Sequence, residues 1–114
     1  MADEALKSKV GQLASQIHEE VVKNRRHLHA NPELSFNEYQ TSAFVASQLD
    51  ALNIPYQKMA DTGLVALIKG AKPSDAVVAL RADMDALPIL EANEVSYKSK
   101  NEGIMHACGH DVHT

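Results

Sequence analysis

The residues best suited to chemistry are concentrated near the end of the chain, in positions 103–114. This stretch contains the single cysteine, Cys108, together with His106, His110 and His113, and Asp111 lies among them. Thiolate and imidazole groups are common ligands of zinc and other late divalent ions, and a nearby carboxylate can orient a metal-bound imidazole. The composition of this stretch therefore predicts a transition-metal site.

The spacing within Cys108-Gly109-His110 limits how these two ligands can meet. Residues two apart point to nearly opposite sides of a helix, so both can bind one cation only where the backbone is extended or turning. Gly109 permits the unusual backbone angles of such a turn. We therefore expect an extended or turning backbone around Gly109, with Cys108 and His110 as metal ligands.

A second group of polar residues follows the apolar run 76–80 and consists of Arg81, Asp83 and Asp85. Ligand sites in open α/β sheets gather at the carboxyl ends of the strands. If the run is a central strand, Asp83 and Asp85 are candidates to support a catalytic site. The alternative is a local Arg–Asp ion pair where the chain leaves the sheet.

Two other functions are compatible with the same residues. Cys108 could act as the nucleophile of a hydrolase, with His106 or His110 as its base. No residue suited to orient that base is evident in the sequence. The chain could also be a small, non-catalytic, metal-stabilised binding module, but it lacks the second ligand pair that such modules usually carry. A metal-dependent enzyme is the preferred interpretation.

The first part of the chain predicts one long amphipathic helix over residues 4–29. Its apolar side chains recur at helical spacing with polar residues between them; they are Leu6, Val10, Leu13, Ile17, Val21 and Leu28. Basic side chains gather in the last two turns, where the helix dipole stabilises positive charge. We interpret them as a solvated helix end rather than as a binding site for an anionic substrate.

A second helix is expected to follow, with Ser35 as its N-cap. Glu38, three residues later, would complete a capping box, and Leu34 and Tyr39 occupy the positions of a hydrophobic staple. Asn53 is the expected C-cap.

Short extended segments replace the helical pattern after this point. We predict strands at residues 54–59, 64–68 and 76–80, with a turn at 61–63. The last run is continuously apolar, which indicates burial on both faces of a sheet. Two helices followed by three strands predict the opening of an α/β or α+β layered domain.

The overall composition narrows the functional class further. The 114 residues are 45% hydrophobic and carry a net charge of −4. This balance gives no support to nucleic-acid binding. No apolar run reaches the roughly 20 residues of a membrane span. With one cysteine and no signal peptide pattern, the expected compartment is the cytoplasm.

Four ordered segments make the chain resemble the N-terminal part of the amidohydrolase branch of the aminoacylase/carboxypeptidase metallopeptidases. This branch includes hippurate hydrolases, N-acyl-amino-acid amidohydrolases and indole-acetyl-amino-acid hydrolases. The segments are RRHLHANPELSF at 25–36, TGLVA at 62–66, LRADMDALPI at 80–89 and MHACGHDVHT at 105–114. Jointly these segments are highly specific.

The resemblance implies a three-layer α/β/α catalytic domain, of which residues 1–114 would be the N-terminal part, without the lid or dimerisation domain. It implies a homo-oligomeric enzyme with two divalent metal ions, zinc or manganese, with cobalt or nickel as alternatives. By the same resemblance, Cys108 and His110 are metal ligands, and Asp83 and Asp85 match an acidic pair of which Asp85 supports the site. The implied reaction is hydrolysis of the amide bond of an N-acyl amino acid or small peptide.

The resemblance also implies a general base, a glutamate from an adjacent Glu-Glu pair further along the chain. Glu91, Glu94 and Glu102 match no such position. We therefore expect residues 1–114 to form an incomplete catalytic domain that does not hydrolyse amides by itself. The apolar strand at 76–80 would also leave the isolated chain prone to self-association.

Overall fold

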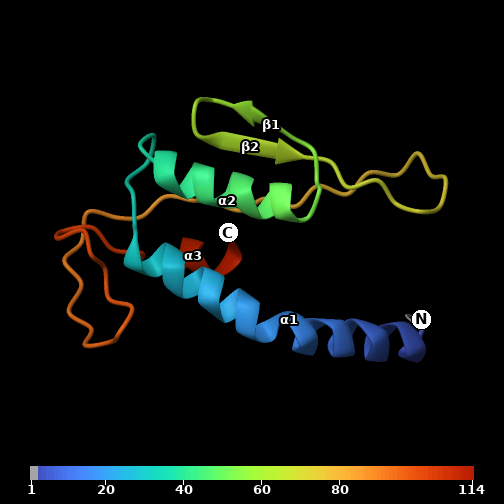
Figure 1. Cartoon of the computed structure of the whole chain (residues 1–114), viewed down its shortest axis with the longest axis horizontal. Helices are drawn as coiled ribbons and strands as arrows, with labels where there is room; N and C mark the ends of the chain where they lie inside the picture. Colours follow the sequence, from blue (N-terminus) through green and yellow to red (C-terminus); the bar gives the residue numbers. More distant parts are fainter. Residues whose placement is uncertain (1–2) are drawn as a thin grey trace.

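The computed structural model describes residues 3–114 and contains three helices and one small sheet. The elements follow the order α1 (Glu4–Ala30), α2 (Tyr39–Ala51), β1 (Tyr56–Met59), β2 (Gly63–Ala66) and α3 (His110–His113). Figure 1 shows α2 between the β1–β2 hairpin and the C-terminal half of α1, with α3 lying against α1. None of the helices within residues 3–114 is long and apolar enough to cross a membrane.

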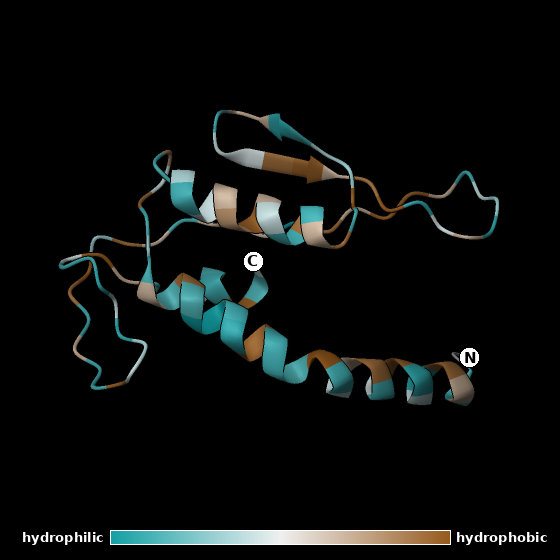
Figure 2. Cartoon of the chain, viewed as in Figure 1, coloured by the Kyte–Doolittle hydropathy of each residue, from teal (hydrophilic) through white to brown (hydrophobic). Residues whose placement is uncertain are grey.

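Helix α1 confirms the predicted long helix and extends it to Ala30. Asp3 caps its start, because the carboxylate accepts a hydrogen bond from the Ala5 N–H at 3.0 Å. In the first five turns, the hydrophobic colour recurs along one side of the ribbon (Figure 2). The apolar side chains of these turns are about half exposed. Only the C-terminal end, with Leu28 and His29, is buried. The packed core therefore begins near residue 28.

Helix α2 begins later than the sequence predicts, and the expected capping box is wrong. Its N-cap is Glu38, and the Glu38 side chain makes no capping hydrogen bond to the first backbone N–H groups of the helix. Instead, the Glu33 carboxylate accepts hydrogen bonds from the N–H groups of Gln40 at 3.1 Å and Thr41 at 2.6 Å. A full negative charge suits these unpaired amides and the positive end of the helix dipole better than a hydroxyl does.

Ser35 and Glu38 have other partners, which explains why the predicted cap fails. The Ser35 hydroxyl donates to Asp85 Oδ2 at 2.5 Å. The Glu38 carboxylate accepts from the Thr62 hydroxyl at 2.8 Å and so ties the start of α2 to the hairpin. Tyr39 is 57% exposed, which also excludes the predicted staple.

The end of α2 agrees closely with the prediction. The C-cap is Leu52, and Asn53 follows with a left-handed φ of 54°. The Asn53 N–H donates to Asp50 O at 3.0 Å, and the Ile54 N–H donates to Leu49 O at 2.9 Å. This pair of bonds is a Schellman motif, and Asn is one of the few residues that adopt its left-handed position readily.

Strands β1 and β2 form an antiparallel hairpin in which Tyr56 pairs with Ala66 and Met59 with Gly63. Two of the three predicted strands are thereby confirmed, β1 shorter than the predicted 54–59 and β2 at 63–66 instead of 64–68. A side chain at position 63 would bring its Cβ within 2.7 Å of Met59 O. Glycine is therefore required where the two strands approach each other at the turn.

The third predicted strand, residues 76–80, is wrong for the part of the chain that the structure describes. The segment is extended but unpaired, and Val77, Val78 and Leu80 are 82%, 84% and 97% exposed. Figure 1 shows it in the long loop that follows β2. A strand needs a neighbouring edge for its backbone groups, and the sheet within residues 3–114 has only β1 and β2.

Candidate metal centre

Three potential metal ligands converge where α3 meets the loop that carries the acidic residues. Asp83, His110 and His113 each offer one ligand atom, and these atoms all lie within 4.8 Å of one another. The two histidines are three residues apart on α3, which turns both side chains to the same face. One carboxylate oxygen and two imidazole nitrogens are a donor set that fits a divalent transition metal ion.

The backbone turns sharply just before α3, and a turning backbone is one of the two forms that the sequence left open here. Gly109 is the N-cap of α3 and has φ 101°, a left-handed conformation that favours glycine. The exposed Cys108 immediately precedes it. Cys108 lies outside the Asp83–His110–His113 group, so its role as a metal ligand remains a prediction from the sequence.

Asp85 holds the His110 ring in one orientation. His110 Nδ1 lies 2.8 Å from Asp85 Oδ1 and 2.9 Å from the Asp85 carbonyl oxygen. Both partners accept, so Nδ1 carries the hydrogen and Nε2 keeps the position that a metal can use. This carboxylate–imidazole pair is the orientation device commonly found behind metal-binding histidines.

Ser35 completes this arrangement from the far side of Asp85. Its hydroxyl hydrogen bond is the main cause that lowers the pKa of the Asp85 carboxyl below its usual value. Burial of Asp85 raises the pKa, but the Ser35 bond, together with hydrogen bonds from the Asp85 backbone and His110, outweighs this effect. Asp85 is therefore a stable anion facing the His110 Nδ1–H.

The Asp83 segment is fixed to α3 and to the loop before α2. Thr114 Oγ1 lies 2.6 Å from both Asp83 O and His110 O, so its hydroxyl donates to one of them and links the two segments. The Ala86 N–H donates to Glu33 O at 2.7 Å. Arg81 pairs with the Asp83 carboxylate at 2.5 Å, which is the local ion pair considered from the sequence. Asp83 therefore belongs both to the ion pair with Arg81 and to the candidate metal cluster with His110 and His113.

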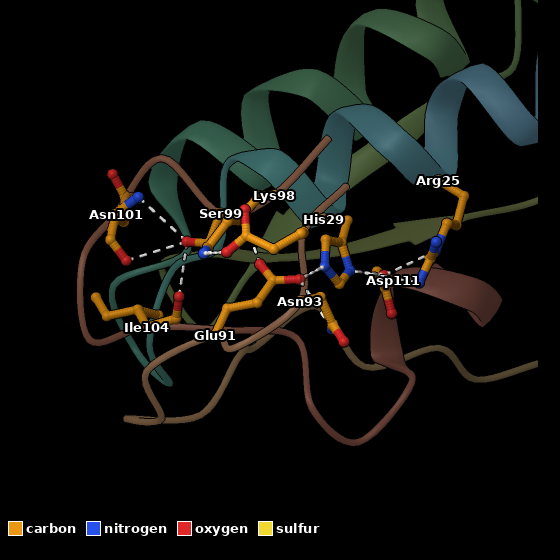
Figure 3. A network of polar contacts seen from close by, with 10 residues as sticks. Arg25, His29, Glu91, Asn93, Lys98, Ser99, Asn101, Ile104 and Asp111 are labelled. Atoms are coloured by element: carbon orange, nitrogen blue, oxygen red, sulfur yellow. Dashed lines mark hydrogen bonds and ion pairs between the residues drawn. The ribbon is translucent and has the colours of Figure 1, made fainter. Parts of the chain in front are cut away.

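The basic residues at the end of α1 are not simply a solvated helix end, and that interpretation is wrong for Arg25 and His29. His29 Nε2 lies 2.8 Å from Glu91 Oε1, and His29 Nδ1 lies 2.8 Å from Asp111 Oδ2 (Figure 3). Arg25 Nε makes an ion pair with the same Asp111 oxygen at 2.9 Å, without hydrogen-bond alignment. Long-range pairing with carboxylates, rather than the helix dipole, determines where these basic side chains lie.

This buried network contains an ionised glutamate, Glu91. The side chains of His29, Glu91 and Asp111 are 4%, 2% and 1% exposed. Burial raises the pKa of Glu91, but hydrogen bonds from His29, the Ser99 N–H and Asn93 outweigh it and lower the pKa to about 2. Buried charges are stable only when paired in this way.

His106 lies in the same region and is buried, with 5% of its surface exposed. Neither ring nitrogen has a hydrogen-bond partner among the described residues. Burial is the main cause that lowers the pKa of His106, so the ring is neutral near pH 7. The sequence alone does not reveal this difference, because His106 lies in the same histidine-rich stretch as His110 and His113, which are less buried.

Sequence reasoning placed His113 in the stretch that predicts a metal site but did not name it as a ligand, and it did not connect His29 with Glu91. The three-residue spacing of His110 and His113 could have indicated a shared helix face, had a helix been expected there. His29 and Glu91 are 62 residues apart and carry no comparable local signal.

Residues 79–114 match the family described as Peptidase family M20/M25/M40. Uncharacterized hydrolases of Staphylococcus aureus and Staphylococcus saprophyticus are each 51% identical to this chain over 94 residues, which are 82% of this chain and 24% of each relative. The chain thus spans about a quarter of the length of the curated relatives it matches.

Two solved structures have the same fold over most of this chain. The YXEP protein of Bacillus subtilis, described as a dinuclear metal binding peptidase from the M20 family, has a TM-score of 0.80 at 41% identity and matches 85% of this chain and 28% of its own. A proposed aminohydrolase from methicillin-resistant Staphylococcus aureus has a TM-score of 0.86 at 36% identity, over 93% and 28%. The predicted α/β fold and the predicted family resemblance are confirmed.

Proposed function

Since this chain corresponds to the N-terminal part of hydrolases of the M20 peptidase family, we propose that it belongs to a metal-dependent enzyme. The proposed reaction is hydrolysis of the amide bond of N-acyl amino acids or small peptides. The observation that supports it best is the meeting of Asp83, His110 and His113, with His110 oriented by Asp85. Residues 1–114 are proposed to be the N-terminal part of the catalytic domain.

The candidate site residues have two kinds of proposed role, metal binding and orientation of a ligand. Asp83, Cys108 and His110 hold metal, with His113 as an additional ligand that the cluster geometry supports. Asp85 keeps the proton of His110 on Nδ1 and the lone pair on Nε2. Bound divalent ions would polarise the scissile carbonyl and lower the pKa of water. Two ions are proposed because a dinuclear relative shares the fold, with zinc, manganese, cobalt or nickel as candidates.

The general base is proposed to lie outside residues 1–114. A Glu-Glu pair does occur at Glu19–Glu20, but it precedes the metal motif and lies on the exposed half of α1. Without a positioned base, hydrolysis by residues 1–114 alone should fall by a factor of about 10² to 10⁴. This chain therefore supplies ligands and their orientation rather than the complete reaction.

The test compares the complete protein with His110→Ala and Asp83→Asn, using metal content and hydrolysis of a panel of N-acyl amino acids. Both variants should lose most bound metal and most activity, because His110→Ala removes a ligand atom and Asp83→Asn removes the negative charge of another ligand. His18→Ala is the matched control, since His18 is exposed on α1 far from the cluster. Full activity after chelation of all metal would refute the metal mechanism and favour a Cys108 nucleophile.

A further inference from the structure

Helix α3 is too short to orient itself. It has four residues, His110–His113, and a helix of one turn has almost no internal hydrogen bonding to stabilise it. Its direction must come from side-chain contacts with the rest of the molecule. Asp111 is the one buried residue of α3, and its carboxylate faces His29 and Arg25 of α1.

His29 connects three segments that are distant in sequence. It projects from the last turn of α1, contacts Glu91 of the loop that follows the acidic residues, and contacts Asp111 of α3 (Figure 3). Each ring nitrogen of His29 lies 2.8 Å from a carboxylate oxygen, Nδ1 from Asp111 Oδ2 and Nε2 from Glu91 Oε1. The planar ring therefore sets the separation and the angle between the two carboxylates.

The Glu91 side of this contact is itself held firmly. The second carboxylate oxygen, Oε2, accepts from the Ser99 N–H at 2.6 Å, and Asn93 Nδ2 donates to Oε1 at 3.1 Å. The same loop is fastened to the end of α1, because the Lys100 N–H donates to Ala30 O at 3.0 Å. The Glu91 carboxylate that binds His29 is thus itself held in place by several hydrogen bonds.

We propose that His29 is a positioning residue of the metal centre, acting through Asp111 to orient α3 so that His110 and His113 face Asp83. The role rests on the proposed metal-dependent function. His29 cannot be a metal ligand in this arrangement, since both ring nitrogens are taken by carboxylates. Arg25, paired with the same Asp111 oxygen, supports the same orientation.

The experiment measures cobalt(II) binding to the complete protein through the visible absorption of the bound ion. His29→Ala should weaken cobalt affinity about 10- to 100-fold, the range found when residues behind metal ligands are replaced. The shape of the absorption spectrum should also change, because the ligands lose their fixed directions. Ala46→Gly is the matched control. It destabilises the buried side of α2 without touching α3 and should leave affinity and spectrum unchanged.

A purely structural role for His29 would lower stability alone, as in Ala46→Gly. Wild-type cobalt affinity and spectrum in folded His29→Ala would therefore overturn the proposal. Should His29→Ala not fold, Arg25→Met tests the same link, because the Arg25 side chain is one-third exposed and its removal is better tolerated. That variant should weaken cobalt affinity by roughly 10-fold, and unchanged affinity would equally overturn the proposal.

The wild-type protein separates this proposal from the proposed function. Absence of cobalt binding by the wild type would reject the metal-dependent function and the positioning role together. Cobalt binding that depends on His110 and not on His29 would reject the positioning role alone.

Discussion

Replacing Glu91 with Gln removes one charge from the centre of the buried network and keeps the shape of the side chain. In the folded protein the pKa of Glu91 falls from its usual 4.5 to about 2. At about 1.4 kcal/mol for each pH unit, this fall corresponds to roughly 3 kcal/mol in favour of the folded state at neutral pH. Breaking a buried ion pair by removing one partner costs a similar amount.

The pH dependence follows from the direction of this change. A carboxyl whose pKa is lowered by folding stabilises the folded state when it is ionised. The contribution is therefore complete above about pH 4.5 and is lost as the pH falls toward about 2. Glu91→Gln should lower the free energy of unfolding by about 3 kcal/mol at pH 7. The difference from the wild type should shrink steadily below about pH 4.5.

The assay is urea unfolding followed by far-ultraviolet circular dichroism at several pH values between 7 and about 3. Glu94→Gln is the matched control, because the Glu94 side chain is 89% exposed and pairs only with Lys98 in the same loop. An exposed pair of this kind contributes at most about 1 kcal/mol. Equal stability of Glu91→Gln and wild type at pH 7, or a difference that is independent of pH, would refute the account of the network.

Four further changes test separate parts of the structure. Ser35→Ala removes a hydrogen bond to Asp85. It should raise the pKa of the Asp85 carboxyl and weaken cobalt binding by up to about 10-fold. An unchanged cobalt titration would contradict the proposed connection between Ser35 and the metal centre. Cys108→Ala should remove most bound metal and activity, and full occupancy by elemental analysis would exclude the thiolate as a ligand. Glu33→Gln should lower the free energy of urea unfolding by about 1 kcal/mol, because the start of α2 loses its charged cap; no change would show that the cap is unimportant. Gly63→Ala should lower the melting temperature, since the new Cβ meets a backbone oxygen at 2.7 Å at a cost of about 1 to 3 kcal/mol, and an unaltered melting temperature would mean that the hairpin relaxes freely.

Local patterns in the sequence were sufficient for several features of this protein. The spacing of apolar residues predicted α1 almost to its last residue, and Asn53 marked the end of α2. Gly109, which the sequence marked as a position open to unusual backbone angles, has a left-handed φ of 101°. These features depend on neighbours within a few positions, where backbone sterics and helical periodicity dominate the free energy. The family resemblance likewise came from short contiguous segments.

Contacts between distant residues decided the features that were predicted wrongly or not at all. The hydroxyl of Ser35 had a local use as a helix cap and a long-range use at Asp85, 50 residues away, and it serves the second. His29 could satisfy the helix dipole locally, but two buried carboxylates bind it instead. The run 76–80 has the composition of a buried strand, yet a strand also needs an adjacent edge, and the described residues provide none. Local patterns show which interactions a residue is able to make. The packing of distant segments decides which of these interactions it does make.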